Sequence, residues 1–524
     1  MPGELRRALA GAATLAVVAG ALFFQDLGRY PLWDQDEARH AEVACEMASA
    51  GGVRRLFLPT LELAPYREKP AGHYWLVALA YALGGVGAGS ARAVNATAGL
   101  LTVLGLYAYM LSRAGVATAL GTGLVAATSV GWFGLARYAN LDMTFTALVT
   151  AGVLAGLAWL GRPPPRRPPI APYLAAGAAC LVKGPLGLGL VFGPLLLAAL
   201  FDRQRPALRD LGLIRGLAIT AATAGLFYIP AAILDPSYVR AFAATNLRRF
   251  GANAPHREPA YYYLLWLPVL FLPWTLLAAP GMLGAARDPG GRRLVLWAVF
   301  VLAVLSLARG KLATYVLPAL PPLALMTGPC LTRTVLEGPR DREAWAITAG
   351  GSVWAMALLL AGGAAPFAAH SYPIPGSGRA LLAGAACLWA LALALLLWRA
   401  ELRAVPLAVL GSVLTLYPLG VRFVAPAIAA LHSEAAVARR IEPMGPAPVI
   451  AFSCHAPSLV FYTRRPVIHT EDPELVRDLF SRDEPIFLLT GRRHFDEIER
   501  LLGPRAQLWH ATARRRLYGN RPPR

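Results

Sequence analysis

Charged residues are scarce in this 524-residue chain, at 15%, whereas 56% of the residues are hydrophobic. The mean hydropathy is +0.49. This balance excludes an ordinary soluble globular protein, because few soluble cores could bury so much apolar surface. In lipid, only helices and closed barrels satisfy every backbone polar group. The apolar runs are rich in Leu, Ala and Val and do not alternate, so the sequence predicts an all-α polytopic membrane protein.

Cysteine is also rare, and the five cysteines are scattered along the chain: Cys45, Cys180, Cys330, Cys387 and Cys454. Their spacing excludes a zinc knuckle and a disulfide framework. The first apolar run, residues 8–24, is not followed by a small-x-small cleavage site, which argues against a removable signal peptide. We therefore expect this run to be the first transmembrane helix.

Positive charge, in contrast, is abundant, with a formal net charge of +20. In a soluble protein this excess would suggest a nucleic-acid partner. Here most of it lies in short loops between apolar runs, where the positive-inside rule accounts for it. We therefore expect no nucleic-acid partner and place these basic loops in the cytoplasm.

The basic loops all fall on one side of a membrane if two apolar runs depart from a simple crossing. Residues 73–90 should not cross, and residues 171–201 should cross twice, turning near Lys183-Gly184-Pro185. A spanning helix needs roughly 20 residues, which leaves room for both adjustments. The prediction is a bundle of about thirteen transmembrane helices, with the N-terminus inside and the C-terminus outside.

Two domains are expected. Residues 1–432 should form the transmembrane domain, including an outer loop at 25–90, and residues 433–524 a small α/β domain outside the membrane. In this second region the segments 447–453, 458–463 and 484–490 have the composition of strands, whereas 473–480 and 494–502 have helical periodicity.

The stretch PLWDQDEARHAE, residues 31–42, carries charges of both signs in the outer loop. A solvated loop would explain charges in general. However, a carboxylate beside a membrane must find a partner or a cation. Asp34-Gln35-Asp36 resembles the metal-binding DxD of nucleotide-sugar transferases, but nucleotide sugars are cytoplasmic and this loop is expected outside. A sugar donor at this side should therefore be linked to a lipid.

A second outer carboxylate, Asp142, begins an apolar run in ARYANLDMTF. It could cap a helix and interact with the helix dipole. Alternatively, Asp36 and Asp142 could serve as catalytic acid or base, a role that requires a suitable pKa and reach to the reacting proton. Spacing does not decide which of the two is the base.

Cations from four outer segments complete a candidate phosphate site: Lys69, Lys183, Lys311 with Tyr315, and Arg257. Lysine suits a phosphate as a point charge, although Lys69 could instead extend to the membrane interface. Lys183 lies within an apolar run, where lysine is rare unless it lines a cavity or a turn. Glu68 and His256 could hold a zinc ion, although a hydrogen-bonded loop histidine is the simpler interpretation.

Six segments occur in an order that resembles one known family, between residues 28 and 330: YPLWDQDEARHAEVACEM, YREKPAGHYWL, ARYANLDMTF, LVKGPLGL, FGANAPHREPAYYYLLWLPVLFLPW and SLARGKLATYVLPALPPLAL. The chain resembles the lipid A aminoarabinose transferases and the wider protein-mannosyltransferase-like branch of the GT-C glycosyltransferases. The resemblance implies a bacterial inner-membrane enzyme with a thirteen-helix bundle. It also implies metal-independent, inverting transfer of a sugar, such as 4-amino-4-deoxy-L-arabinose, from undecaprenyl phosphate to an acceptor such as lipid A on the periplasmic face.

The same resemblance implies roles for single residues. Asp36 and Asp142 would be the catalytic carboxylates, and Arg39, Lys69 and Tyr315 would contact the donor phosphate. A structural zinc in the family implies Glu68 and His256 as ligands. The segment after Lys69-Pro70 departs from the family pattern, because Ala71-Gly72-His73 stands where a second proline is usual. This departure concerns the sugar and the acceptor rather than the reaction type.

Three alternative functions remain open. A lipid-linked sugar transporter or flippase would place charges along a path at the membrane midplane and often contains internal repeats, and the sequence shows neither. An O-antigen ligase uses a similar donor but typically lacks the early paired-acid loop. A GT-C transferase could also act on a protein or another glycan.

Overall fold

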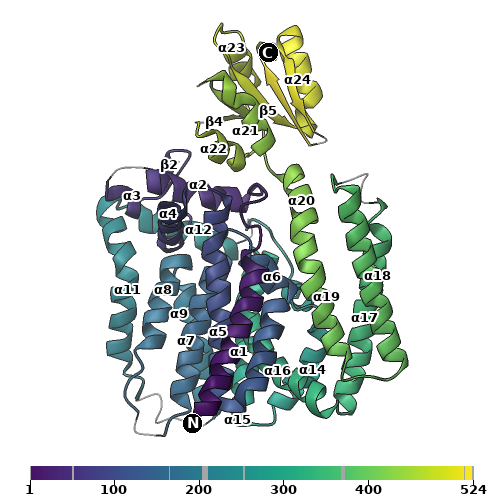
Figure 1. The fold of residues 1–524 in the computed structure, drawn as a ribbon. Coiled ribbons are helices and arrows are strands. Elements are labelled where there is room, and N and C mark those ends of the chain that lie inside the picture. The colour runs from purple at the N-terminus through teal and green to yellow at the C-terminus, as the bar shows by residue number, and fades with distance from the viewer. Residues whose placement is uncertain are drawn as a thin grey trace.

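A computed structural model describes residues 2–49, 52–163, 166–202, 210–251, 254–367, 372–445, 447–465, 467–512 and 514–521. Long helices run side by side and form the main body, and the C-terminal domain stands on one end of it (Figure 1). The main helices are α1 (Pro2–Phe24), α5 (Ala88–Thr128), α7 (Leu141–Leu160), α8 (Ala171–Lys183), α9 (Leu186–Phe201), α11 (Leu213–Leu234), α15 (Pro289–Leu307), α16 (Leu320–Glu337), α17 (Asp341–Ala364), α18 (Gly376–Trp398) and α19 (Val405–Leu419).

Nine helices in the described ranges are long and apolar enough to cross a membrane. The pair α13 (Tyr262–Leu270) and α14 (Thr275–Ala285) is bent by 105° and has the length and composition of a broken span or of a re-entrant loop. The non-helical Gly115 divides α5 into two parts, and α8 and α9 are two further, shorter apolar helices. The sequence predicts about thirteen crossings, whereas nine segments of the described ranges, or ten with the bent pair, are long and apolar enough to cross. The chain is therefore a multi-pass membrane protein with a helical fold.

The helices break at both places where the sequence predicts a departure from simple crossing. Residues 171–201 divide into α8 and α9 around Gly184, whose φ of 74° is a left-handed conformation that favours glycine. Residues 73–90 contain the short helix α4 (Gly72–Gly84), which ends at Gly85 before α5 begins. Helix α4 lies with α2 (Asp36–Ser49), α3 (Arg54–Phe57) and α12 (Tyr238–Leu247) at the end of the bundle nearest the C-terminal domain (Figure 1). We name this end the polar end.

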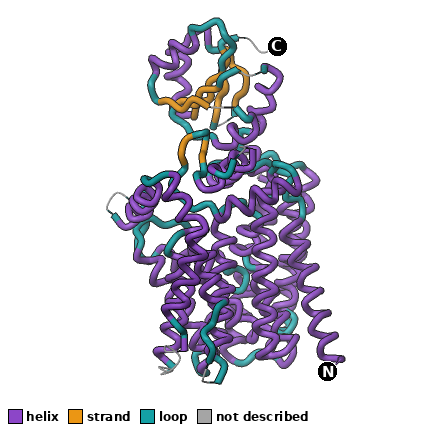
Figure 2. The backbone as a smooth tube through the Cα atoms, turned by 90° about the vertical axis from the view of Figure 1, so that its left-hand side faces the viewer, coloured by secondary structure: helices purple, strands orange, loops and turns teal. Residues whose placement is uncertain are grey.

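The C-terminal domain contains a five-stranded sheet of order β4-β3-β5-β7-β6, which Figure 2 shows above the helical body. Strand β3 (Val449–Phe452) pairs in parallel with β4 (Val467–Thr470) and β5 (Phe487–Gly491). Strand β7 (Arg515–Gly519) pairs antiparallel with β5 and with β6 (Gln507–Ala511). Successive strand residues face opposite sides of the sheet, and each side has its own apolar cluster. The small α/β fold predicted for this region is confirmed.

The predicted elements of this domain are confirmed with one exception. Segment 447–453 contains β3, and segment 484–490 contains β5 except its last residue. Segments 473–480 and 494–502 correspond to α23 (Pro473–Phe480) and α24 (Phe495–Leu502). The strand predicted at 458–463 is wrong, because this segment is the helix α22 (Pro457–Thr463). Pro457 fits the first turn of a helix, and α22 buries its apolar side chains between the sheet and α2.

Candidate active site

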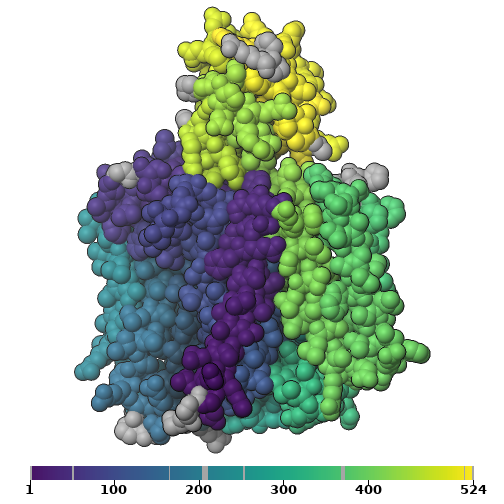
Figure 3. All heavy atoms as spheres, viewed as in Figure 1, coloured from purple at the N-terminus to yellow at the C-terminus, as the bar shows by residue number. Residues whose placement is uncertain are grey.

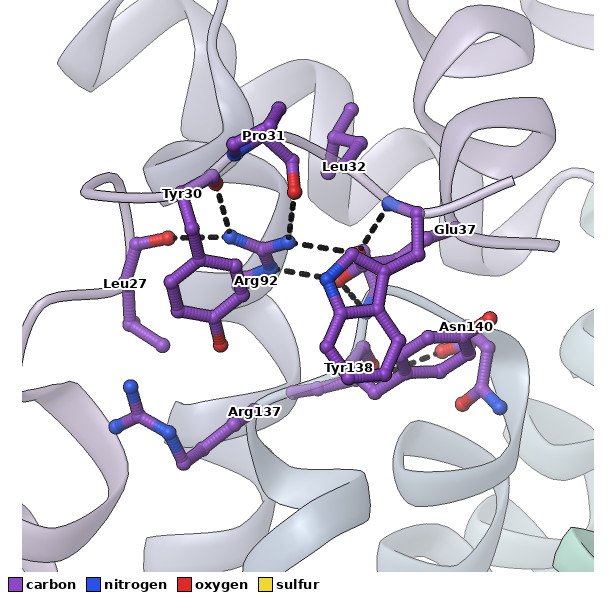
Figure 4. Close-up of polar contacts among 12 residues, drawn as sticks. Leu27, Tyr30, Pro31, Leu32, Glu37, Arg92, Arg137, Tyr138 and Asn140 are labelled. Atoms are coloured by element: carbon purple, nitrogen blue, oxygen red, sulfur yellow. Dashed lines mark hydrogen bonds and ion pairs between the residues drawn. The ribbon is translucent and has the colours of Figure 1, made fainter. Parts of the chain in front are cut away.

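A buried ion pair between Glu37 and Arg92 fixes the loop that precedes α2 (Figure 4). Arg92 is fully buried and Glu37 is 1% exposed, and two guanidinium nitrogens of Arg92 donate to the carboxylate at 2.6 and 2.7 Å. The carboxylate also accepts from the backbone N–H groups of Trp33 and Ala139. Arg92 donates further to three loop carbonyls, those of Leu27, Tyr30 and Pro31. Because the pair is saturated with hydrogen bonds, it holds the loop, α2 and the turn before α7 in one arrangement.

Asp36 and Arg39 form the next ion pair along the chain, on the first turn of α2. Their side chains are 39% and 31% exposed, in contrast to the buried Glu37. The electrostatic neighbours of Arg39 include Glu68 on the following loop. Both side chains are thus partly accessible, and the assignment of Asp36 as a catalytic carboxylate and of Arg39 as a phosphate contact stays a prediction.

Asp142 lies 5% exposed in the first turn of α7. It is not the cap of this helix, because the Asn140 side chain accepts from the backbone N–H of Asp142 at 3.0 Å. The Asn140 amide also donates to the Asp142 carboxylate at 3.0 Å, and Lys183 at the end of α8 forms an ion pair with it. The capping alternative for Asp142 is thus wrong, and its carboxylate is instead directed at a lysine from another helix.

Further cations and aromatic rings surround this pair. The ammonium of Lys183 lies 4.7 Å from the ring centre of Tyr315 and 5.2 Å from that of Phe145. Arg249 donates to the Tyr315 hydroxyl at 2.6 Å. Burial lowers the pKa of Lys69 to about 7, and the charges of Arg249 and Lys183 lower it further. Four segments far apart in the sequence thus bring three cations close to one carboxylate.

A network of neutral polar side chains lies next to the turn that precedes Asp142. His73 on α4 is fully buried, and its Nδ1 lies 3.1 Å from the Thr144 hydroxyl. That hydroxyl donates to Asn95, whose amide donates to the carbonyl of Asn140 at 2.7 Å. Burial lowers the pKa of His73 to about 4. The ring is therefore neutral at pH 7, and it links α4 and α5 to the start of α7.

Lys311 and Arg257 occupy a different position. The Lys311 ammonium donates to the Glu258 carbonyl at 3.0 Å, and its backbone N–H donates to the His256 carbonyl. Arg257 is exposed and forms a backbone bridge with Gly310. These bonds join two loops just before Tyr315. Within the described ranges, neither side chain contacts Asp142 or Lys183, so their assignment as phosphate ligands stays a prediction.

The zinc site proposed from the sequence finds no support in the geometry. Glu68 and His256 are both exposed, and no contact joins them in the part of the chain that the structure describes. The same described residues include no group of three or more His, Cys, Asp or Glu side chains that could hold a metal ion. Protein zinc sites use three or four such ligands. The residues present therefore do not fit a zinc ion.

Lysine is rare among the basic residues of the chain. Of the 50 Lys and Arg residues only three are lysine, namely Lys69, Lys183 and Lys311. Two of these three lie around Asp142 in the structure. Arg249, in contrast, could not be distinguished by sequence from the other arginines, because only the fold brings it to Tyr315.

The chain is similar to known transferases. The family model of dolichyl-phosphate-mannose-protein mannosyltransferases matches residues 46–241. The undecaprenyl phosphate-alpha-4-amino-4-deoxy-L-arabinose arabinosyl transferase 1 of Pseudomonas fluorescens is 32% identical over 62% of this chain and 60% of its own length. The corresponding transferase of Edwardsiella ictaluri is 33% identical over 61% of this chain and 59% of its own. The chain thus spans about 60% of the length of these relatives.

The solved structures decide the fold. ArnT from Cupriavidus metallidurans bound to undecaprenyl phosphate superimposes with a TM-score of 0.80 at 21% identity, over 97% of this chain and 98% of that chain. The chain has the ArnT-like GT-C fold. The apo form of the Cupriavidus metallidurans protein gives the same TM-score over 97% of each chain. The fold that the resemblance implies is therefore confirmed over 97% of the chain.

Proposed function

We propose that the chain is an integral-membrane glycosyltransferase that transfers a sugar from undecaprenyl phosphate to an envelope acceptor. The ArnT-like relatives support 4-amino-4-deoxy-L-arabinose as the sugar and lipid A as the acceptor. The observation that carries the proposal is the convergence of Lys183, Lys69 and Arg249 on Asp142 and Tyr315 at the polar end of the bundle.

This arrangement suits a phosphate leaving group. In an inverting transfer, an acceptor oxygen attacks the anomeric carbon from the face opposite the phosphate. The bond between that carbon and the phosphate oxygen breaks, and the phosphate leaves with the electron pair. Lys69, Lys183 and Arg249 would stabilise the charge that develops there, which is the usual large electrostatic contribution of such sites. We propose that these side chains supply the stabilisation without a resident metal.

The carboxylates would act on the acceptor. Asp36 is accessible and can take the proton of an acceptor hydroxyl or orient an acceptor group, whereas Asp142 is held by Lys183 and Asn140. An acceptor phosphate is already ionised and requires orientation more than deprotonation. We therefore assign contact with the acceptor to Asp36 and placement of the cations to Asp142.

We further propose that the polar end faces the periplasm of a bacterium, with the C-terminal domain outside the inner membrane. The positive-inside distribution of the short basic loops supports this orientation. A lipid-linked donor in the outer leaflet would then reach the cation cluster from the bilayer.

A sugar transporter is the second candidate, and catalysis distinguishes it. Asp36→Asn, Asp142→Asn and the wild-type chain would be expressed at matched levels in a bacterial host, and lipid A and other envelope glycans would be profiled by mass spectrometry. A sugar added to lipid A with wild type alone supports the transferase. An equal change with all three proteins supports transport, and a sugar on a protein or another glycan identifies a different acceptor.

A further inference from the structure

A basic cavity of about 400 Å³ lies beside the candidate active site at the polar end. Its lining includes three arginines, Arg54, Arg55 and Arg67, and one carboxylate, Asp235. Leu234 and Tyr238 provide part of its apolar wall. We propose that this cavity binds a phosphate group of the lipid acceptor and anchors it next to the reacting centre. The inference rests on the proposed function and extends it to a second subsite.

The charges of the cavity are only partly neutralised. Arg67 pairs with Asp235 at 2.7 Å, and Asp235 also accepts from the backbone N–H and the hydroxyl of Ser237. Arg55 has one weak hydrogen bond, to the Thr60 hydroxyl at 3.4 Å. Arg54 is exposed, and the described part of the chain gives its side chain no partner. Two guanidinium groups thus remain available, and guanidinium forks suit phosphate oxygens.

Exposed apolar side chains lie close to the cavity. Leu234 is the last residue of the spanning helix α11, and Ile229 and Ile233 on the same helix are 61% and 73% exposed. Next to the two arginines, Val53 and Leu56 are 68% and 40% exposed. Basic side chains that adjoin exposed apolar ones near the end of a spanning helix are typical of the boundary between hydrocarbon and headgroups. A ligand can therefore enter this cavity from the bilayer.

The cavity shares a wall with the donor site. Tyr238 lines the cavity, is 1% exposed and donates its hydroxyl proton to the carbonyl of Lys69 at 2.8 Å. Arg67 is only two residues before Lys69. A phosphate bound to Arg54 and Arg55 would thus lie on one side of the segment 67–69, with the Lys69 cation on the other. This spacing suits a glycolipid acceptor that carries a phosphate in addition to its reacting group.

The test compares the double variant Arg54→Gln/Arg55→Gln with a matched control, Arg342→Gln/Arg399→Gln. The control removes two exposed arginines that lie far from the cavity, at the end of α18 and the start of α17. Purified full chains in nanodiscs would be titrated with lipid A and with enzymatically dephosphorylated lipid A, and retained lipid would be measured by native mass spectrometry.

We expect the cavity variant to lose at least tenfold in affinity for phosphorylated lipid A, and the control and the dephosphorylated lipid to show no such difference. In the transfer assay, KM for the acceptor should rise tenfold while kcat changes less than twofold. Equal retention by wild type and the cavity variant would overturn the proposal. The proposal would also be overturned if the cavity variant retained lipid A normally and lost only bound phosphatidylglycerol, which would make the cavity a site for bulk phospholipid. Complete displacement of lipid A from the wild type by millimolar inorganic phosphate would overturn it as well.

The binding measurement does not depend on catalysis. Retention of lipid A that requires Arg54 and Arg55, in a chain without transferase activity, would sustain the subsite and reject the proposed function. Transfer that is active but insensitive to both arginines would reject the subsite and leave the function in place.

Discussion

The carboxylate of Asp34 accepts two hydrogen bonds from Ser458, one from its backbone N–H at 2.8 Å and one from its hydroxyl at 2.6 Å. The two residues are 424 positions apart, and they join the loop before α2 to α22 of the C-terminal domain. Leu32 adds a bond to the Tyr462 hydroxyl at 2.8 Å. Figure 3 shows the C-terminal domain resting on these N-terminal segments. The domain therefore holds the loop that ends at Asp36.

Ser458→Ala should loosen this junction. A hydrogen bond to a charged group contributes roughly 1.5–3 kcal/mol, and the substitution removes the one from the Ser458 hydroxyl to Asp34 while the backbone N–H still donates. We expect faster hydrogen exchange in residues 31–42 and lower transferase activity, with the transmembrane helices unchanged. Ser481→Ala is the matched control, because the Ser481 hydroxyl bonds only to the nearby Asp478 carbonyl at the domain surface. Equal exchange in 31–42 for both variants would contradict the role of Ser458.

The junction should also respond to pH. Burial raises the pKa of Asp34 to about 6 and those of Glu42 and Glu434 to about 7, although Arg515 and Arg464 oppose the rise. A raised carboxyl pKa means that the docked state binds protons more tightly than the undocked state. The stabilisation is complete below about pH 4 and is lost as the pH rises through 6 to 7. Docking should therefore be tighter at pH 5 than at pH 8.

The rate of amide hydrogen exchange in α22, divided by the rate in α24 of the same domain, measures the tightness of docking. Both rates are first corrected for the intrinsic pH dependence of amide exchange. Asp34→Asn should remove the part of the response centred near pH 6. An α22-to-α24 ratio that does not change between pH 5 and pH 8 would count against the junction as the responding element.

The Glu37–Arg92 pair makes a prediction about stability. Glu37→Gln leaves the guanidinium of Arg92 buried without its counter-charge, which typically costs 3–5 kcal/mol. We expect a clearly lowered unfolding temperature in detergent, measured by size-exclusion chromatography after heating. Glu401→Gln, at an exposed position that forms no ion pair in the described structure, serves as the control. An unchanged unfolding temperature for Glu37→Gln would show that the pair contributes little.

Lys69 predicts a pH dependence of donor binding. Its pKa of about 7 means that the ammonium loses its proton as the pH rises through neutrality, so the attraction for a donor phosphate weakens. KM for the donor should rise above pH 7 in the wild type. Lys69→Arg keeps the charge at every relevant pH and should flatten that rise, whatever its effect on kcat. A wild-type KM that is constant from pH 6 to 8.5 would contradict the assignment of Lys69.

Part of the site could be read from single residues. Asp142 and Lys183 both attract attention in the sequence, because ionisable groups in apolar runs are costly unless they are paired or functional. That the two form one pair is a tertiary fact, since 41 positions, which include nearly all of α7 and α8, separate them. Local pattern failed at 458–463, where a strand-like composition forms a helix through contacts with α2. In the sequence Glu37 is one of several charged residues in residues 31–42. Only the fold distinguishes it, because Glu37 is buried and its neighbour Asp36 is partly exposed.

The scarcity of lysine has a practical consequence. Amine-reactive probes react with the unprotonated amine. Lys69 alone among the three lysines combines partial exposure with a pKa near 7. Lys311 is only 3% exposed, and Lys183 is held in an ion pair with Asp142. A mild acylating dye at neutral pH should therefore label this position ahead of the others. The chain thus carries a native reporter at the proposed donor site, and protection of that amine would measure occupancy without any engineered tag.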